Sequence, residues 1–217
     1  KSNLASMGIY VFTWKKLRQY LIDDENTPGS SNDFGKNIIP NMLAAGEKML
    51  AYRFEGYWKD VGTLESLWDA NMDMLSRGDL DLLDDDWPIY ARIPNQPPAF
   101  MGREAKVEHS VVTQGCEVSG EAFNSVLSDS VVIEEGARVR YSVLMPGVHV
   151  KKGATVEYAI LGEGARIGQG AKVGGDPMDY DPDKWGIAVI GPGAAIEDGE
   201  VVAPKTMLNQ NHEEVSR

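Results

Sequence analysis

The chain has two regions with different hydrophobic periodicity, and the first, up to about residue 80, mixes strand-like and helix-like patterns. Met7–Phe12 is a nearly continuous apolar run, as in a strand that is buried on both faces. Residues 14–24 place Leu17, Tyr20 and Leu21 on one helical face. This alternation predicts α/β structure at the start of the chain.

The rest of this region predicts one more strand and two more helices. Met49–Phe54 alternates as in a strand, and Ser31 or Asn32 can cap a helical segment that Pro40 must interrupt, because proline lacks an N–H. Thr63 is the expected N-cap of an amphipathic helix that runs through Leu64, Leu67, Trp68, Asn71, Met74 and Leu75. Three helices and two strands are too few for a layered α/β fold. We therefore expect this region to be the second part of a domain.

From about residue 103 the chain is a repeat with a constant period. Val131–Val139 aligns with Val148–Val156 and with Ala165–Val173, so the unit begins at positions 131, 148 and 165. Aliphatic residues recur in steps of six, six and five: Ile133, Val139 and Leu144, then Val150, Val156 and Leu161, then Ile167 and Val173. Glycines recur at the turns between them: Gly136, Gly153, Gly164 and Gly170. Three short strands per coil, each pointing one aliphatic residue inward, predict a triangular β-solenoid.

The register continues past an insertion. Val189–Ile196 resumes it. Without an insertion, the equivalent of Ile160 in the next coil would be residue 177, but in the sequence it is Val189. The polar segment 175–187 is therefore predicted to be a loop that leaves the solenoid. Cys116, one full coil before Ile133, is expected to point inward as a packing thiol.

Residues 79–102 have the composition of a linker. Acidic residues precede Trp87, and prolines follow it up to residue 98. We expect Trp87 and Tyr90 to pin this segment to the protein. The predicted domains are thus 1–78, the linker 79–102, and 103–217.

Composition narrows the function classes. The formal net charge of −12 over 217 residues argues against nucleic-acid binding, which depends on Lys and Arg, and no apolar run is long enough to span a membrane. The single cysteine excludes an intrachain disulfide and is typical of a reducing cytoplasm. No Cys/His cluster has zinc-ligand spacing. Because Lys1 is neither an initiator Met nor the start of a signal pattern, we expect an internal piece of a longer cytoplasmic protein.

The run Glu55–Thr63 is the most informative candidate for chemistry. It places the Asp60 carboxylate just before a predicted helix N-terminus. Such a position can hold a hard cation together with a phosphate. The plain alternative is that Asp60 is a loop residue that caps the helix.

Three motifs in order, followed by the solenoid, resemble one family. Leu4–Tyr10, Ser31–Lys36 and Tyr57–Thr63 are similar to segments of bacterial glucose-1-phosphate adenylyltransferase (ADP-glucose pyrophosphorylase), and the resemblance to its C-terminal half covers essentially the whole chain. It implies part of an α/β, Rossmann-like nucleotidyltransferase domain, followed by a left-handed parallel β-helix of hexapeptide repeats. It also implies the synthesis of ADP-glucose and pyrophosphate from ATP and glucose 1-phosphate, in glycogen biosynthesis.

The resemblance implies roles for five residues in binding glucose 1-phosphate. Ser6 would bond the sugar phosphate, Tyr10, Asp33 and Phe34 would shape the glucose pocket, and Trp58 would form another wall. Each has a plain alternative: a turn residue for Ser6, core packing for Tyr10 and Phe34, a helix cap for Asp33, and simple packing for Trp58.

For Asp60 the resemblance implies a catalytic ligand of Mg²⁺, which it would share with a second aspartate outside this chain. Lys59 is expected to orient the loop or to pair with an acid. The family's Gly-rich nucleotide loop and its Glu-Lys-Pro segment do not occur in the sequence. The chain alone is therefore predicted to be inactive.

For the solenoid, the resemblance implies a homotetramer, or a tetramer that includes a paralogous subunit, and allosteric effectors that are sugar phosphates or carboxylates. Basic residues do lie along the coils, where most are expected to be solvated: Arg138, Arg140, Lys151, Lys152, Arg166 and Lys172.

Three other functions remain open. A hexapeptide acyltransferase would need a histidine base, for which His109 and His149 are the candidates. A non-catalytic regulatory subunit would be expected to lose the sugar and metal ligands. A related sugar-phosphate nucleotidyltransferase would differ in its base or sugar.

Overall fold

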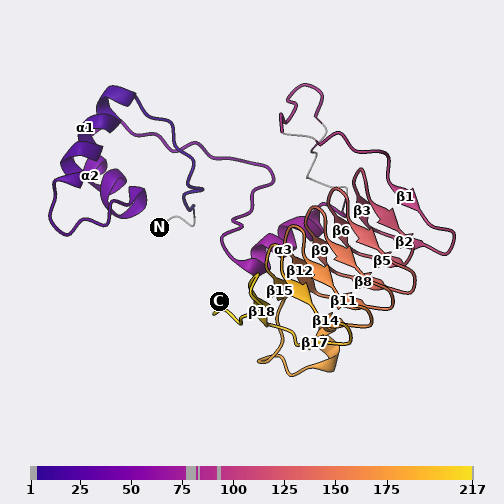
Figure 1. Cartoon of the computed structure of the whole chain (residues 1–217). Helices are drawn as coiled ribbons and strands as arrows, with labels where there is room; N and C mark the ends of the chain where they lie inside the picture. The colour runs from indigo at the N-terminus through magenta and orange to yellow at the C-terminus, as the bar shows by residue number, and fades with distance from the viewer. Residues whose placement is uncertain (1–3, 77–81, 83, 92–93, 217) are drawn as a thin grey trace. The chain divides into compact units, whose positions relative to one another are not determined.

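The structure is a computed structural model that describes residues 4–76, 82, 84–91 and 94–216, and these fall into two compact units, Lys1–Gly56 and Tyr57–Arg217. The first unit contains the helix α1 (Trp14–Glu25), the single-turn π-helix η1 (Phe34–Ile38) and the helix α2 (Ile39–Ala44), coloured indigo to violet in Figure 1. The predicted helix over 14–24 is thus confirmed.

The two strands predicted in the first region are wrong for this structure. Met7–Phe12 and Met49–Phe54 belong to no sheet among the described residues. Val11, Leu50 and Tyr52 are 99%, 89% and 89% exposed. A strand that is buried on both faces needs a neighbour on each side to satisfy its backbone, and the described part of this unit offers none.

Pro40 lies in the first turn of a new helix, as predicted. The π-helix η1 passes directly into α2, with Pro40 in its first turn, where the missing N–H costs no hydrogen bond. The small core beneath them contains Ile38 and Met42, which are 2% and 5% exposed. Beside this core, the buried Asp24 carboxylate accepts a hydrogen bond of 2.8 Å from the Ser30 hydroxyl.

The second unit is a parallel β-solenoid whose coils each contribute one strand to each of three six-stranded sheets (Figure 1). One sheet contains β1 (Phe100–Met101), β4 (Glu117–Val118), β7 (Val132–Ile133), β10 (His149–Val150), β13 (Arg166–Ile167) and β16 (Ala195–Ile196). The second contains β2 (Lys106–Glu108), β5 (Glu121–Phe123), β8 (Arg138–Arg140), β11 (Thr155–Glu157), β14 (Lys172–Gly174) and β17 (Val201–Val202). The third contains β3 (Val111–Val112), β6 (Val126–Leu127), β9 (Val143–Leu144), β12 (Ala159–Leu161), β15 (Ala188–Ile190) and β18 (Met207–Leu208).

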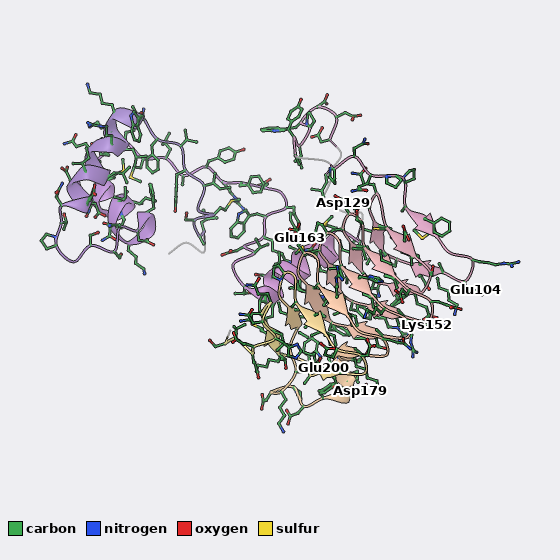
Figure 2. All side chains as sticks on the ribbon, viewed as in Figure 1. Glu104, Asp129, Lys152, Glu163, Asp179 and Glu200 are labelled. Carbon is green, nitrogen blue, oxygen red and sulfur yellow. The ribbon has the colours of Figure 1, made fainter. Side chains whose placement is uncertain are left out.

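The predicted register is confirmed over the central coils. Ile133 pairs with Val150 and Val150 with Ile167, all three fully buried. Past the insertion, Leu161 pairs with Ile190, as expected. The insertion itself leaves the sheets and contains the short helix η2 (Pro177–Asp179). Charged residues mark the turns around the coils and the insertion in Figure 2: Glu104, Asp129, Lys152, Glu163, Asp179 and Glu200.

One coil is two residues shorter than predicted, and this corrects the placement of Cys116. Val118, not Cys116, pairs with Ile133. Cys116 is still fully buried, and its thiol lies 3.1 Å from the Ser128 carbonyl oxygen. The shortening falls at the corner before β5, where a Cβ on Gly120 would lie 2.3 Å from the Ala137 carbonyl oxygen. Only glycine fits this tight corner without displacing the next coil.

A ladder of serines links the coils at another corner. The Ser110, Ser125 and Ser142 hydroxyls accept the N–H groups of Ser125, Ser142 and Ala159 at 3.1, 3.2 and 3.1 Å. Each hydroxyl also donates to a carbonyl two residues upstream. The preceding residue has a positive φ in every coil of the ladder: His109, Asn124, Tyr141 and Tyr158. The hydroxyls therefore satisfy main-chain groups that the turned corner takes out of the sheet.

The helix α3 (Leu64–Asp73) packs against the outside of the solenoid, beside β9 and β12 (Figure 1). Thr63 caps it as predicted, in a capping box with Ser66. The predicted pinning of the linker is wrong, since Trp87 and Tyr90 are 82% and 92% exposed. No described helix is both long and apolar enough to cross a bilayer.

Candidate functional site

Ser6 and Tyr10, from the first candidate motif, contact each other. Their hydroxyls are 2.8 Å apart, and the Gly8 N–H donates to the Ser6 Oγ at 3.2 Å. Gly8 has a φ of +74°, in the left-handed region that favours glycine. The Ala-Ser-Met-Gly turn thus presents two hydroxyls side by side at the surface.

An aromatic cluster continues this surface. The Tyr10 ring stacks on Phe34 with a centroid distance of 5.9 Å and an interplanar angle of 15°. Phe12 touches both, at 5.9 and 5.8 Å. Phe12 was not predicted as a site residue, although it lies two residues from Tyr10 in a strand-like run, where residues two apart share a face. The cluster brings the two motifs together around a ring wall.

Asp33, next to Phe34, caps η1. Its Oδ1 accepts the Lys36 N–H at 2.7 Å. The predicted caps, Ser31 and Asn32, are wrong by one or two residues, because the Ser31 hydroxyl bonds the Asn37 side chain instead. The plain alternative for Asp33, a helix cap, is thus formed in this structure, and the residue still adjoins the aromatic cluster.

In the second unit, the run 57–63 displays Asp60 at the surface. Its Oδ1 accepts the Gly62 N–H at 3.0 Å, which closes a local turn just before the Thr63 cap. Trp58 is 46% exposed. Trp58 is therefore not part of a core among the described residues, and its role stays a prediction.

Asp73, the last residue of α3, anchors this run through two hydrogen bonds. Its Oδ2 accepts hydrogen bonds from the Tyr57 hydroxyl at 2.9 Å and from the Lys59 ammonium at 2.6 Å. The Lys59 hydrogen bond holds the pKa of the Asp73 carboxyl below its ordinary value, and Asp73 in turn raises the pKa of Lys59. Burial raises the pKa of Tyr57, and the hydrogen bond to Asp73 raises it further. The expected pairing of Lys59 with an acid is confirmed, but its partner was not identified from the sequence.

The candidate metal ligand fits a cation that takes few protein ligands. Asp60 offers an exposed carboxylate, the hard oxygen donor that Mg²⁺ prefers. Within the described ranges no group of three or more His, Cys, Asp or Glu side chains could hold a metal ion. This arrangement suits Mg²⁺, which is commonly bound by one or two carboxylates, waters and substrate phosphates, but not a metal that needs a complete cage from this chain.

The first unit therefore gathers Ser6, Tyr10 and Phe34, with Asp33 beside them, and the second carries Trp58 and Asp60. The structure describes each group within its own unit.

The two histidines that an acyltransferase would need are engaged elsewhere. His149 Nε2 lies 2.7 Å from Glu134 Oε1 on the outer face of the solenoid. His109 Nδ1 contacts the Asn124 side-chain oxygen at the corner of the first coil. Each histidine therefore has a side-chain partner within the solenoid, and neither contact by itself identifies a general base.

The basic residues of the coils include several with acidic partners. Lys152 lies 3.0 Å from Glu135, and Lys151 lies 3.6 Å from Asp198. Arg140 lies 4.0 Å from Glu121 and from Glu157, beside a shallow groove of about 430 Å³ on the outer face of β5, β8 and β11. These pairs offer little uncompensated positive charge for an anion.

Comparisons with known proteins match both regions. The family model described as Nucleotidyl transferase matches residues 1–77, and the model described as GlmU-like, C-terminal hexapeptide matches residues 97–191. The second match agrees with the observed β-solenoid. The first places the helices of the first unit within a nucleotidyltransferase domain.

Curated relatives carry one name. A protein named glucose-1-phosphate adenylyltransferase from Clostridium botulinum is 56% identical over 143 residues, or 65% of this chain and 37% of that protein. Proteins of the same name from Bacillus thuringiensis and Desulforamulus reducens are each 53% identical over 140 and 143 residues, covering 37% and 36% of their lengths. The resemblance to this enzyme is thereby confirmed over about 65% of the chain, and the match spans just over a third of these relatives.

Among solved structures, the acetyltransferase domain of PglB from Neisseria gonorrhoeae, in complex with acetyl coenzyme A, has a TM-score of 0.42 and 21% identity, over 55% of this chain and 58% of that chain. This likeness is too distant to bear on function.

Proposed function

We propose that this chain provides the sugar-phosphate and metal part of the active site, together with the β-helix, of a glucose-1-phosphate adenylyltransferase. The reaction joins ATP and glucose 1-phosphate into ADP-glucose and pyrophosphate. The observation that carries the proposal is the joining of two separate motifs in one surface by the Ser6–Tyr10 hydroxyl contact and the Tyr10–Phe34 stack. The identity of 52–56% to relatives of that name supports it.

The geometry of the first unit suits a glucose phosphate. An aromatic face such as that of Tyr10 and Phe34 packs against the apolar face of a sugar ring. The Ser6 and Tyr10 hydroxyls can donate to phosphate or sugar oxygens once their mutual bond is exchanged, and Asp33 can accept from sugar hydroxyls. From the resemblance, Trp58 is assigned to the binding of glucose 1-phosphate as well.

Asp60 is assigned as the catalytic metal ligand. A bound Mg²⁺ would neutralise charge on phosphate oxygens during in-line attack on the α-phosphorus. Asp60 contributes an oriented carboxylate, because its Oδ1 is held by the Gly62 N–H. A second acidic ligand and the nucleotide loop are assigned to a part of the enzyme outside this chain.

The remaining assignments follow from the resemblance. We assign the enzyme to the cytoplasm and to glycogen synthesis, as a homotetramer, and we expect sugar-phosphate or carboxylate effectors. The stacked parallel sheets support the assignment as an oligomer, because they form a rigid scaffold with large flat faces.

A chimera tests the proposal. The part of the C. botulinum relative that lies N-terminal to its match is fused to this chain and assayed with ATP, glucose 1-phosphate and Mg²⁺. We expect ADP-glucose from the chimera and none from residues 1–217 alone. Asp60→Asn should lower kcat at least about 100-fold, as expected for a metal ligand. Glu55→Gln, which alters an 84% exposed side chain of the same run, should leave it unchanged.

Four outcomes would contradict the proposal. Synthesis by residues 1–217 alone would refute the division of the site. Full activity of the Asp60→Asn chimera would remove the metal role. A chimera that prefers another sugar 1-phosphate would favour a related nucleotidyltransferase, and a folded but inactive chimera would favour a regulatory subunit.

A further inference from the structure

The run that carries Trp58 and Asp60 is held against α3 through hydrogen bonds on one of its two sides. Tyr57 and Lys59, two residues apart, both donate to the same Asp73 oxygen, and both are half-buried. The interleaved Trp58 and Asp60 are exposed. In an alternating segment, residues two apart share a face. Fixing Tyr57 and Lys59 against α3 therefore directs Trp58 and Asp60 away from it.

The carboxylate that holds the run is itself on a fixed element. Leu67, Trp68 and Met72 of α3 pack against the outward side chains of β9 and β12, beside which Figure 1 shows the helix. The Trp68 indole N–H also donates to the Tyr141 carbonyl at 2.7 Å. Asp73 is thus presented by a helix that the solenoid anchors along its length.

We propose that Asp73 is a positioning residue, which sets the orientation of Asp60 and Trp58 by holding Tyr57 and Lys59 on the opposite face of the run. It touches neither substrate nor metal. Partners that orient a ligand contribute strongly to metal affinity, and their loss typically costs about 10- to 100-fold. The catalytic consequence of this inference rests on the proposed function, whereas the structural one does not.

The first test needs only residues 1–217. Asp73→Asn keeps the size of the side chain and removes its charge, and Tyr57→Phe removes one of the two bonds. Backbone ¹⁵N relaxation should show lower order parameters in residues 57–62 for Asp73→Asn, and a smaller change for Tyr57→Phe. Order parameters in the solenoid strands should not change. Asp69→Asn is the matched control on the same helix, because Asp69 lies 4.0 Å from Lys59 and makes only the weaker contact.

The second test uses the chimera described above. Asp73→Asn should raise the Mg²⁺ concentration for half-maximal activity about tenfold at saturating substrate, with a smaller change in the KM for ATP. Asp73→Glu should restore part of this loss, and Asp69→Asn should have little effect.

The outcomes separate the two claims. Unchanged order parameters in residues 57–62, or an unchanged Mg²⁺ requirement in an active chimera that Asp60→Asn inactivates, would overturn the positioning role and leave the proposed function intact. An inactive chimera with the expected change in order parameters would overturn the proposed function and keep the hold of Asp73 on the run.

Discussion

The Trp68 indole N–H donates a hydrogen bond of 2.7 Å to the main-chain carbonyl of Tyr141, 73 residues further along the chain. The same ring stacks on Tyr158 of the next coil, with a centroid distance of 6.0 Å. Tyr158 in turn stacks on Tyr141 at 4.7 Å. One side chain of α3 thereby joins the helix to two successive coils.

Trp68→Phe should loosen this joint. The substitution keeps an aromatic ring but leaves the Tyr141 carbonyl without its donor, so we expect the free energy of unfolding to fall by about 1 kcal/mol. Urea unfolding followed by circular dichroism measures the loss, and hydrogen exchange should locate it in α3. The control Trp87→Phe, at a ring that is 82% exposed, should change stability by less than about 0.5 kcal/mol. Equal effects of the two variants would show that the indole bond adds nothing.

Ser142→Ala tests the serine ladder. Ser142 is fully buried, and its removal leaves the Ala159 N–H without its acceptor, so we expect a loss of about 1–3 kcal/mol. Ser110→Ala, at the first rung, should cost less because Ser110 is only half-buried, so water can replace its hydroxyl more easily. Thermal unfolding of the two variants side by side measures the difference. A larger loss at Ser110 would contradict the assignment of the stability to the buried rungs.

Gly120→Ala should destabilise the short coil through steric overlap with the next coil, and not through backbone strain. Gly120 does not have a positive φ, but an added Cβ would lie 2.3 and 2.6 Å from two carbonyl oxygens of the next coil. We expect a loss of at least about 1–3 kcal/mol. Gly153→Ala is the comparison, because Gly153 has a φ of +69° and no heavy atom within 4 Å of the added Cβ. Its cost should be the backbone strain alone, about 1–2 kcal/mol. The reverse order in a urea titration would show that the corner can relax.

The register of the central coils could be predicted because each inward aliphatic repeats the same burial requirement one coil later, as Val139 and its partner Val156 do. The shorter coil could not be predicted, because its two missing residues fall in a corner, where no side chain is required to point inward. Cys116 was therefore assigned to the wrong slot, although its burial was predicted correctly.

The failures in the first region have a different physical cause. Met7–Phe12 has the composition of a buried strand, but composition predicts a strand only where a neighbouring strand can bond its backbone. In the site, the hold of Asp73 on Lys59 joins residues 14 apart through long side chains, and no local periodicity encodes such a pairing. Ser6, Tyr10 and Phe34 were found because they lie within short motifs, whereas Phe12 lies between motifs and was missed.

The Glu121–Lys106 pair predicts a pH dependence. The Lys106 ammonium, 3.0 Å from Glu121 Oε1, holds the pKa of Glu121 below its ordinary value. A carboxyl whose pKa is lowered by folding stabilises the protein above its unfolded pKa, near 4.5, and this contribution is lost as the pH falls through the folded pKa. Glu121→Gln should therefore cost about 0.2–1 kcal/mol at pH 7 in low salt, and less at pH 3 or in high salt. Glu104→Gln, at an exposed turn residue, is the control. A cost that is the same at pH 3 and pH 7 would show that packing, not charge, is lost.

Because its thiol is buried, Cys116 is predicted to react slowly in the native protein. Burial raises the pKa of Cys116, and the side chain is 0% exposed, so neither the reactive thiolate nor access to it is provided. We expect negligible reaction with a thiol-specific disulfide reagent at pH 8, and one equivalent per chain after addition of urea. Ser76→Cys in a Cys116→Ala background places a thiol at an exposed position and should react at once in native buffer. If Cys116 reacts as fast as this exposed thiol without denaturant, the short coil opens readily. Its tight corner at Gly120 would then not keep the reagent out of the solenoid core.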